Sequence, residues 1–393
     1  MNPASGPVPT RTLAFLAAAS FASAASLRAC DPILPEIAAS FLTTPGNAAS
    51  VITFFGVAYG IAQFIYGFVG ERFGKLETIA FATILSAATA ALCAIAGTLG
   101  LLVVARLAAG VTAAAIIPLA MAWIGDVIPY EQRQSVLARF LSGQISGITL
   151  GQVFSGVITQ HFGWRFVFVM LAALFLIAGI AVAYELRSRG RQRTVSSETP
   201  GWALHRAGPM FRQPWVAVVL ITAFFEGMFF FGAFTFVGSY LWARFGLGFD
   251  LIGLIVAGFG IGGLIYSASA AQLVHRLGET GLVAWGGVMV AISFVAITAA
   301  PTPIAVAPAT ILAGFSYYMI HNTLQTNATQ MAPGVRGLAV GTFASCLFLG
   351  QSVGVALAAP VFDYTGGAPI FLTAGCLLIV LGFVFRLCLL RRP

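Results

Sequence analysis

Long apolar runs separated by short polar breaks make up most of the chain. Each run is about 20 residues long, the length that an α-helix needs to cross the hydrocarbon core of a bilayer. Twelve such runs are present, and they begin near residues 13, 49, 77, 99, 136, 166, 215, 250, 280, 304, 337 and 368. The pattern predicts an all-α membrane protein with twelve membrane-spanning helices.

The composition supports this prediction. Hydrophobic residues make up 59% of the 393 residues and charged residues only 8%, whereas a soluble domain carries roughly 25% charged residues. We expect the first run to be a membrane span and not a cleaved secretory signal, because it continues through Asp31 to Phe41 and is long enough to span. The five cysteines are scattered through apolar runs without paired spacing, so they are expected to pack rather than to form disulfides or bind metal.

The net charge of +8 is spread unevenly along the chain. If the N-terminus is cytoplasmic, nearly all Lys and Arg residues fall at the inner ends of the runs, and only Arg165 and Arg244 fall at the outer ends. This asymmetry follows the positive-inside rule and predicts that both termini lie on the cytoplasmic side of the membrane. We expect this membrane to be a bacterial inner membrane. The charge therefore orients the protein, and we expect no nucleic-acid partner.

The runs divide six and six around a polar stretch at residues 187–214, which we expect to be a cytoplasmic linker between bundles at 1–186 and 215–393. Segments of the two bundles match at an offset near 200 residues. "LGQVFSG" (150–156) matches "LGQSVGV" (349–355), and "YGIAQFIYGFVGERFG" (59–74) matches "FGIGGLIYSASAAQLVHRLG" (259–278). Parallel repeats of this kind build transporters whose site lies at the interface of the halves, near the bilayer midplane.

The loop after the second run, "GFVGERFGKLE", resembles a motif of the major facilitator superfamily, G-x-x-x-D-R-x-G-R/K. The resemblance covers the whole chain and implies two pseudo-symmetric six-helix bundles. It also implies a gating loop, in which glycines allow a tight reversal and the charges contact nearby helix ends. Glu71 replaces Asp, and Leu76 stands where a basic residue is common. The alternative is an ordinary basic inner loop. The residues concerned are Gly67, Glu71, Arg72, Gly74 and Lys75.

The fifth run carries small residues at four-residue spacing, which lets two helix backbones approach closely. Within it, "GITLGQVFSG" is similar to the antiporter signature g-x-x-x-G-P-x-x-G-G of the same superfamily. Gln152 replaces the proline, so the usual kink is not expected, and Ser155 replaces a glycine. A generic packing seam is the alternative. The signature residues are Gly147, Gly151, Gln152, Ser155 and Gly156.

Four ionisable residues lie inside the runs, where each needs a partner, a hydrated cavity or a function. They are Arg28 and Asp31 in the first run, Arg106 in the fourth and Glu226 in the seventh. Asp31 and Arg106 lie at comparable depth and are placed to pair. The prolines that follow Asp31 predict a bent helix. A purely structural ion network remains the alternative.

Resemblance assigns a role to these residues. "DPILPE" (31–36) is similar to the motif at the outer end of helix 1 in drug:proton antiporters, and "RLAAG" (106–110) to their helix 4 motif, whose arginine is implicated in proton transfer.

Glu226 lies among phenylalanines with no basic residue in its own run. Burial favours the neutral form of a carboxyl, so its charge can depend on whether water or a cationic solute is beside it. A permanently protonated Glu226 is the alternative.

Polar residues at helical spacing, together with the phenylalanines of the seventh run, predict a substrate cavity for an amphiphilic solute. Helix-to-helix hydrogen bonding explains each of the polar residues equally well. The candidates are Tyr59, Gln63, Gln144, Phe229, Phe230, Tyr317, His321, Asn322 and Gln325.

The predicted function is proton-coupled efflux of amphiphilic small molecules or drugs by alternating access. The alternative is a transporter of the same fold for one metabolite, such as a sugar, nucleoside or siderophore. The expected partners are a small-molecule substrate, protons and the lipid bilayer, and the chain is expected to work as a monomer. No enzymatic activity, cofactor or metal is expected, because the four histidines are scattered and no catalytic cluster is present in the sequence.

Overall fold

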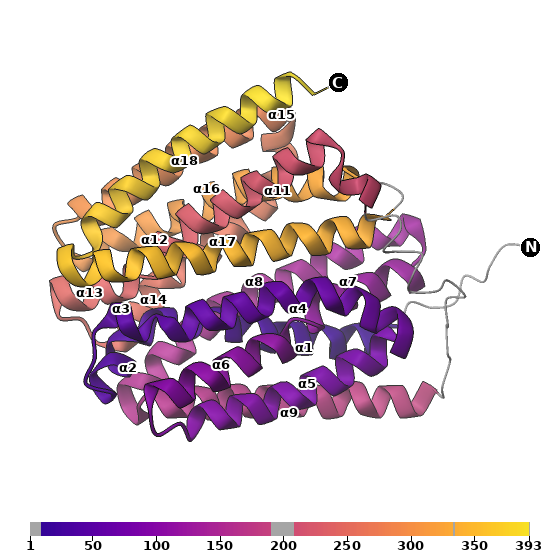
Figure 1. Ribbon diagram of the computed structural model, residues 1–393, viewed down its shortest axis with the longest axis horizontal. Helices are drawn as coiled ribbons and strands as arrows, with labels where there is room; N and C mark the ends of the chain where they lie inside the picture. The colour runs from indigo at the N-terminus through magenta and orange to yellow at the C-terminus, as the bar shows by residue number, and fades with distance from the viewer. Residues whose placement is uncertain (1–8, 190–207, 333–334, 393) are drawn as a thin grey trace, which may run out of the picture.

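The computed structural model describes residues 9–189, 208–332 and 335–392, and all regular structure in these ranges is helical (Figure 1). We call Thr10–Arg189 the N half and Pro214–Leu390 the C half. The helices of the N half are α1 (Thr10–Arg28), the short 3-10 turn η1 (Asp31–Ile33), α2 (Leu34–Ser40), α3 (Pro45–Ala48), α4 (Ser50–Phe73), α5 (Lys75–Ala94), α6 (Leu99–Ala113), α7 (Ile116–Val127), α8 (Tyr130–Phe162) and α9 (Trp164–Arg189).

The C half begins with a seventh span built from four short pieces, of which η2 is a π-helix. The four pieces of this span are α11 (Pro214–Glu226), η2 (Gly227–Phe231), α12 (Gly232–Phe234) and α13 (Val237–Phe245). The remaining helices of the C half are α14 (Phe249–Val256), α15 (Gly258–Ala299), α16 (Pro303–Gln330), α17 (Arg336–Thr365) and α18 (Gly367–Leu390).

Ten segments of the described chain are long and apolar enough to cross a membrane. One of them, Phe249–Ala299, holds two spans, because its 51 residues exceed twice the usual length and the backbone leaves helical geometry at Gly278 (φ 62°, ψ 176°). The 33-residue α8 is a further helix long enough to span, although it is more polar than the ten. The described chain therefore holds twelve spans, which confirms the number predicted from the sequence.

The two halves lie side by side, and the described chain begins and ends at the same end of the molecule (Figure 1). We call this end the inner end and the opposite end the outer end. Helix α9 continues to Arg189, so the first three residues of the predicted linker, 187–189, are helical. The stretch 190–207 lies outside the described residues.

Two sequence features govern the shape of individual spans. The first span breaks after Arg28, passes through the 3-10 turn that contains Pro32, and resumes as α2, whose second residue is Pro35. The bend predicted from these prolines is therefore present. The fifth span is one unbroken helix, α8, which agrees with the replacement of the signature proline by Gln152.

Candidate functional site

The four ionisable residues that the sequence singled out inside the spans, Arg28, Asp31, Arg106 and Glu226, are all buried. Asp31 and Glu226 have no exposed surface, while Arg106 is 1% and Arg28 4% exposed. Arg28 and Asp31 lie where the first span breaks, and Arg106 lies in the middle of α6. A charge at this depth is costly unless it is paired, so the partners of these side chains define the site.

Arg28 connects the two halves of the protein. One of its terminal nitrogens lies 3.3 Å from Asp31 Oδ2, and the other donates a hydrogen bond of 2.9 Å to Gln351 Oε1 in α17 of the C half. Its guanidinium carbon also lies 3.6 Å from the centre of the Phe231 ring, at the end of the π-helix η2. The charge that neutralises Asp31 is thus held by two side chains from the opposite half.

Arg106 does not pair with Asp31, contrary to the expectation from their similar depth. Its guanidinium donates to the Val51 carbonyl at 3.3 Å and to both the hydroxyl and the carbonyl of Ser26 at 3.4 Å. It also lies over the Phe55 ring at 3.9 Å. Arg28 is already one helical turn from Asp31 and takes the position that Arg106 was expected to take.

Glu226 has a partner in another helix. Its Oε2 lies 3.1 Å from Nδ1 of His321 in α16, and the Tyr317 hydroxyl lies 3.1 Å from the same nitrogen. The Tyr317 and His321 rings are stacked, with centroids 5.1 Å apart. The His321 side chain is 13% exposed, so it connects the buried Glu226 to accessible surface. Within the described chain, Glu226 Oε1 has no hydrogen-bond partner.

The phenylalanines after Glu226 differ in their surroundings. Phe230 is fully buried in an aromatic core with Phe234, Phe259 and Phe294, so in this conformation it presents no surface to a solute. Phe229 is half-buried and stacks on Phe225. Phe231, which the sequence did not single out, is the ring that contacts Arg28.

The other cavity candidates lie in both halves. The Tyr59 ring of α4 is buried and lies 4.6 Å from Phe348 of α17, centre to centre, so it contacts the opposite half. Asn322 donates a hydrogen bond of 3.2 Å to the Tyr266 hydroxyl within the C half. Half-buried side chains are found at Gln144 and Gln325, whereas Gln63 is buried.

The predicted gating loop makes a tight turn between α4 and α5. Gly74 adopts φ +97°, a conformation that favours glycine. Lys75 forms an ion pair with Asp126 at the end of α7. Gly67, Glu71 and Arg72 are exposed. The described contact of this loop is therefore made by Lys75, and it lies within the N half.

The glycines of the fifth span face two different neighbours. A Cβ at Gly147 would lie 2.6 Å from the Phe21 carbonyl oxygen, and one at Gly151 2.8 Å from Ala25 Cα, so both glycines pack on α1. A Cβ at Gly156 would lie 2.2 Å from the Phe249 carbonyl of α14 in the C half. Gln152 and Ser155 are fully buried. This stripe of small residues therefore packs both within the N half and between the halves.

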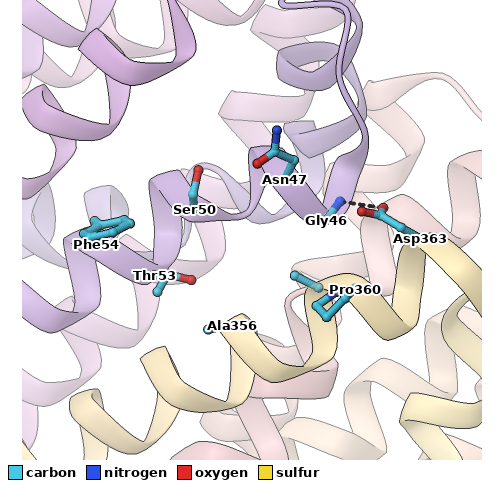
Figure 2. A pocket seen from close by; sticks show the side chains of 9 residues that line it. Gly46, Asn47, Ser50, Thr53, Phe54, Ala356, Pro360 and Asp363 are labelled. Atoms are coloured by element: carbon cyan, nitrogen blue, oxygen red, sulfur yellow. Dashed lines mark hydrogen bonds between the residues drawn. The ribbon is translucent and has the colours of Figure 1, made fainter.

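Hydrogen bonds also join the halves at the outer end. Asp363 of α17 accepts bonds from the Thr44 hydroxyl at 2.6 Å and from the Gly46 amide at 2.9 Å. A pocket lies beside this contact, between α3 and α4 on one side and α17 on the other, and Asn47, Ser50 and Pro360 are among the residues that line it (Figure 2). Gln160 Oε1 of α8 accepts a bond of 2.7 Å from the Phe249 amide of α14. The outer ends of the halves are therefore held together in this conformation.

Phe231, Gln351 and Asp363, which make contacts between the two halves, escaped the sequence analysis. A signal existed for Gln351. It occupies the same place in "LGQSVGV" that Gln152 occupies in "LGQVFSG", so the internal repeat marks both glutamines. Phe231 and Asp363 have no such signal, because their contacts depend on how the halves face each other.

Comparisons with known proteins agree with this architecture. The family model described as Major Facilitator Superfamily matches residues 16–355. The uncharacterized MFS-type transporter YwfA of Bacillus subtilis is 24% identical over 374 residues, which are 93% of this chain and 88% of that protein. The xylose transporter XylE from E. coli, solved in a partially occluded inward open conformation, has a TM-score of 0.73 at 13% identity, with 96% of both chains covered. At this identity the structural likeness shows the fold.

Two relatives with names that describe efflux match a smaller part of the chain. The lincomycin resistance protein of Streptomyces lincolnensis is 30% identical over 199 residues, which are 51% of this chain and 41% of that protein. The multidrug export protein EmrB of Escherichia coli is 25% identical over 156 residues, 40% of this chain and 30% of that protein. Because the family model covers most of the chain, this protein belongs to the Major Facilitator Superfamily and is a multi-pass membrane transporter of that family.

Proposed function

We propose that this transporter exports amphiphilic small molecules in exchange for protons, by alternating access. The observation that carries the proposal is the position of Asp31, a fully buried carboxylate whose counter-ion, Arg28, is bonded to Gln351 of the opposite half. A change in the charge of Asp31 therefore acts directly on a contact that holds the halves together.

Protonation of Asp31 removes the charge that faces Arg28. The guanidinium then lies in a buried site without its counter-ion, which is strongly unfavourable. The balance shifts toward a conformation in which Arg28 finds other acceptors or water. In this way the proton on Asp31 biases the equilibrium between two arrangements of the halves.

Glu226 supplies a second carboxyl on the side of the C half. In this proposal, a solute that enters between the halves replaces the partly exposed His321 as the partner of Glu226. A cationic or hydrogen-bonding solute that takes this place would stabilise the ionised carboxyl and favour release of its proton. Competition of proton and solute for one carboxyl is a sufficient mechanism for exchange.

The relatives named for lincomycin resistance and multidrug export support efflux rather than import. The proposal also includes the features that the sequence predicts for the whole chain: a bacterial inner membrane, cytoplasmic termini, six-helix bundles on either side of the linker, and function as a monomer.

Transport in proteoliposomes tests the proposal. With an imposed pH gradient, the wild type is expected to accumulate ethidium against its concentration gradient, and Asp31→Asn and Glu226→Gln are each expected to abolish this accumulation. Asp250→Asn is the matched control, because it removes a carboxylate of α14 that accepts a hydrogen bond from the neighbouring Leu251 amide. Full ethidium accumulation by both site variants would overturn the proposal.

A further inference from the structure

Buried polar atoms without a partner gather where the first, fifth and seventh spans meet the eighth. These atoms belong to four side chains with no exposed surface. Among the residues that the structure describes, eleven buried side-chain atoms have no hydrogen-bond partner, and five of them lie here: Asp31 Oδ1, Gln152 Oε1, Gln152 Nε2, Thr235 Oγ1 and Ser239 Oγ.

Close backbone contacts bring these side chains to one junction. A Cβ at Gly238 would lie 2.9 Å from the Asp31 carbonyl oxygen, so the seventh span packs directly on η1. Thr235 lies in the turn between α12 and α13, three residues before Gly238, and Ser239 directly follows Gly238 in the first turn of α13. A Cβ at Gly253 would lie 2.6 Å from the Gln152 carbonyl, which places α14 against α8. Helix α8 and α14 also both contact η1.

The direction of Gln152 follows from its neighbours on α8. Gly151 faces α1 and Gly156 faces α14, and at 100° per residue Gln152 points between these two directions. Its amide therefore projects into the space between α1 and α14, beside η1. This is the side of α8 on which Asp31 lies.

Five unpartnered atoms in one place are costly. A buried polar group that makes no hydrogen bond loses its interaction with water without replacement, and native proteins leave few such groups unsatisfied. Buried water molecules with two to four polar partners are the usual solution. A metal cation fits less well, because Gln152 Nε2 is a donor and because Arg28 already lies against Asp31.

We propose that this junction holds ordered water, and that this water carries protons between the outer end of the protein and Asp31. The proposal rests on the proposed proton coupling at Asp31. The row of unpartnered polar atoms continues toward the outer end on the same face of α8. Thr159 lies seven residues after Gln152, about 10 Å further along the helix. It is buried, and its hydroxyl also lacks a partner in the described structure. The next residue, Gln160, is exposed at the outer end. The ionisable groups beside the junction are Asp31, Arg28, Cys30 and Arg106.

Two variants that remove polar atoms without changing the size of the side chain greatly, Thr235→Val and Gln152→Leu, test the proposal. Thr83→Val is the matched control for the first, because Thr83 is equally buried but its hydroxyl donates to the Ile79 carbonyl of its own helix. Proteoliposomes loaded with ethidium and the pH dye pyranine receive an acid pulse at the outer end of the protein. The initial rate of proton entry is measured, together with the melting temperature of each purified variant.

A hydrated path predicts that Thr235→Val and Gln152→Leu slow proton entry several-fold, that Thr83→Val does not, and that neither junction variant melts above the wild type. A dry junction predicts the reverse, because removing an unsatisfied hydroxyl then raises the melting temperature. An unchanged proton rate or a raised melting temperature in Thr235→Val would overturn the proposal. If Asp31→Asn retains full antiport, the proposed function fails instead, whatever the junction variants do.

Discussion

Arg28 of the N half donates a hydrogen bond to Gln351 of the C half, 2.9 Å away at a site where both side chains are buried. The same guanidinium pairs with Asp31 and lies over Phe231. One cation therefore contacts both an acidic side chain of the N half and two helices of the C half, α17 and η2. This relationship underlies the predictions that concern the two arrangements of the halves.

Gln351→Leu should weaken the closed arrangement of the outer ends. A hydrogen bond to a charged group contributes about 1.5–3 kcal/mol, so its loss should shift the equilibrium between arrangements roughly 10- to 100-fold. Spin labels at Leu42 and Tyr364, both highly exposed near the outer end, allow the distance between the halves to be measured. Longer distances are expected in Gln351→Leu than in the wild type or in the exposed control Gln330→Leu. Identical distributions in all three would contradict this prediction.

Gly156→Ala should destabilise the contact between α8 and α14, which joins the two halves. The new Cβ would lie 2.2 Å from the Phe249 carbonyl, and a backbone atom cannot move away as a flexible side chain can. A cost on the order of 1–3 kcal/mol is expected. The control is Gly143→Ala in the same helix, where a Cβ meets no atom within 4 Å among the described residues. Alanine at position 143 should leave the free energy of unfolding unchanged or raise it by up to about 1 kcal/mol. Equal melting temperatures for the two variants would contradict the prediction.

The Glu226–His321 contact should appear as a coupling energy. His321→Leu leaves Glu226 without its partner and should destabilise the protein, whereas the same change in a Glu226→Gln background should cost less. A double-mutant cycle based on unfolding of the purified protein is expected to give a coupling of about 1–3 kcal/mol. Strictly additive effects would show that the two side chains do not interact.

The Lys75–Asp126 pair of the gating loop should contribute little to stability. The Asp126 side chain is 58% exposed, and exposed ion pairs contribute about 0.2–1 kcal/mol and are screened by salt. Asp126→Asn should therefore lower the melting temperature slightly at low salt and hardly at all at high salt. A large loss that persists in high salt would show that the pair is a structural anchor.

Much of the fold follows from the sequence because membrane spans are defined by length and apolarity, which are local properties. The break in the first span was equally predictable from Pro32 and Pro35, since proline acts on its own helix. The unbroken α8 follows in the same way from Gln152 in place of proline. These features need no knowledge of which helices are neighbours.

The partners in the site could be predicted only in part. Depth along a span placed Asp31 and Arg106 together, yet depth does not give the rotation of a helix, and Arg106 instead bonds to Ser26 and Val51. His321 was expected in the cavity, but its contact with Glu226 depends on how α11 and α16 pack. Because lipid-facing and buried faces of a membrane helix are both apolar, hydrophobic periodicity does not reveal these rotations.

Proton release on substrate binding is the most direct test of loading and unloading at Asp31 and Glu226. Purified protein in a weakly buffered solution with a pH dye is mixed with ethidium, and binding is followed in parallel by fluorescence polarisation. The wild type and Asp250→Asn should release protons on binding, and the double variant Asp31→Asn/Glu226→Gln should bind without release. Equal proton release from the double variant, or binding to the wild type without any release, would contradict the proposed exchange.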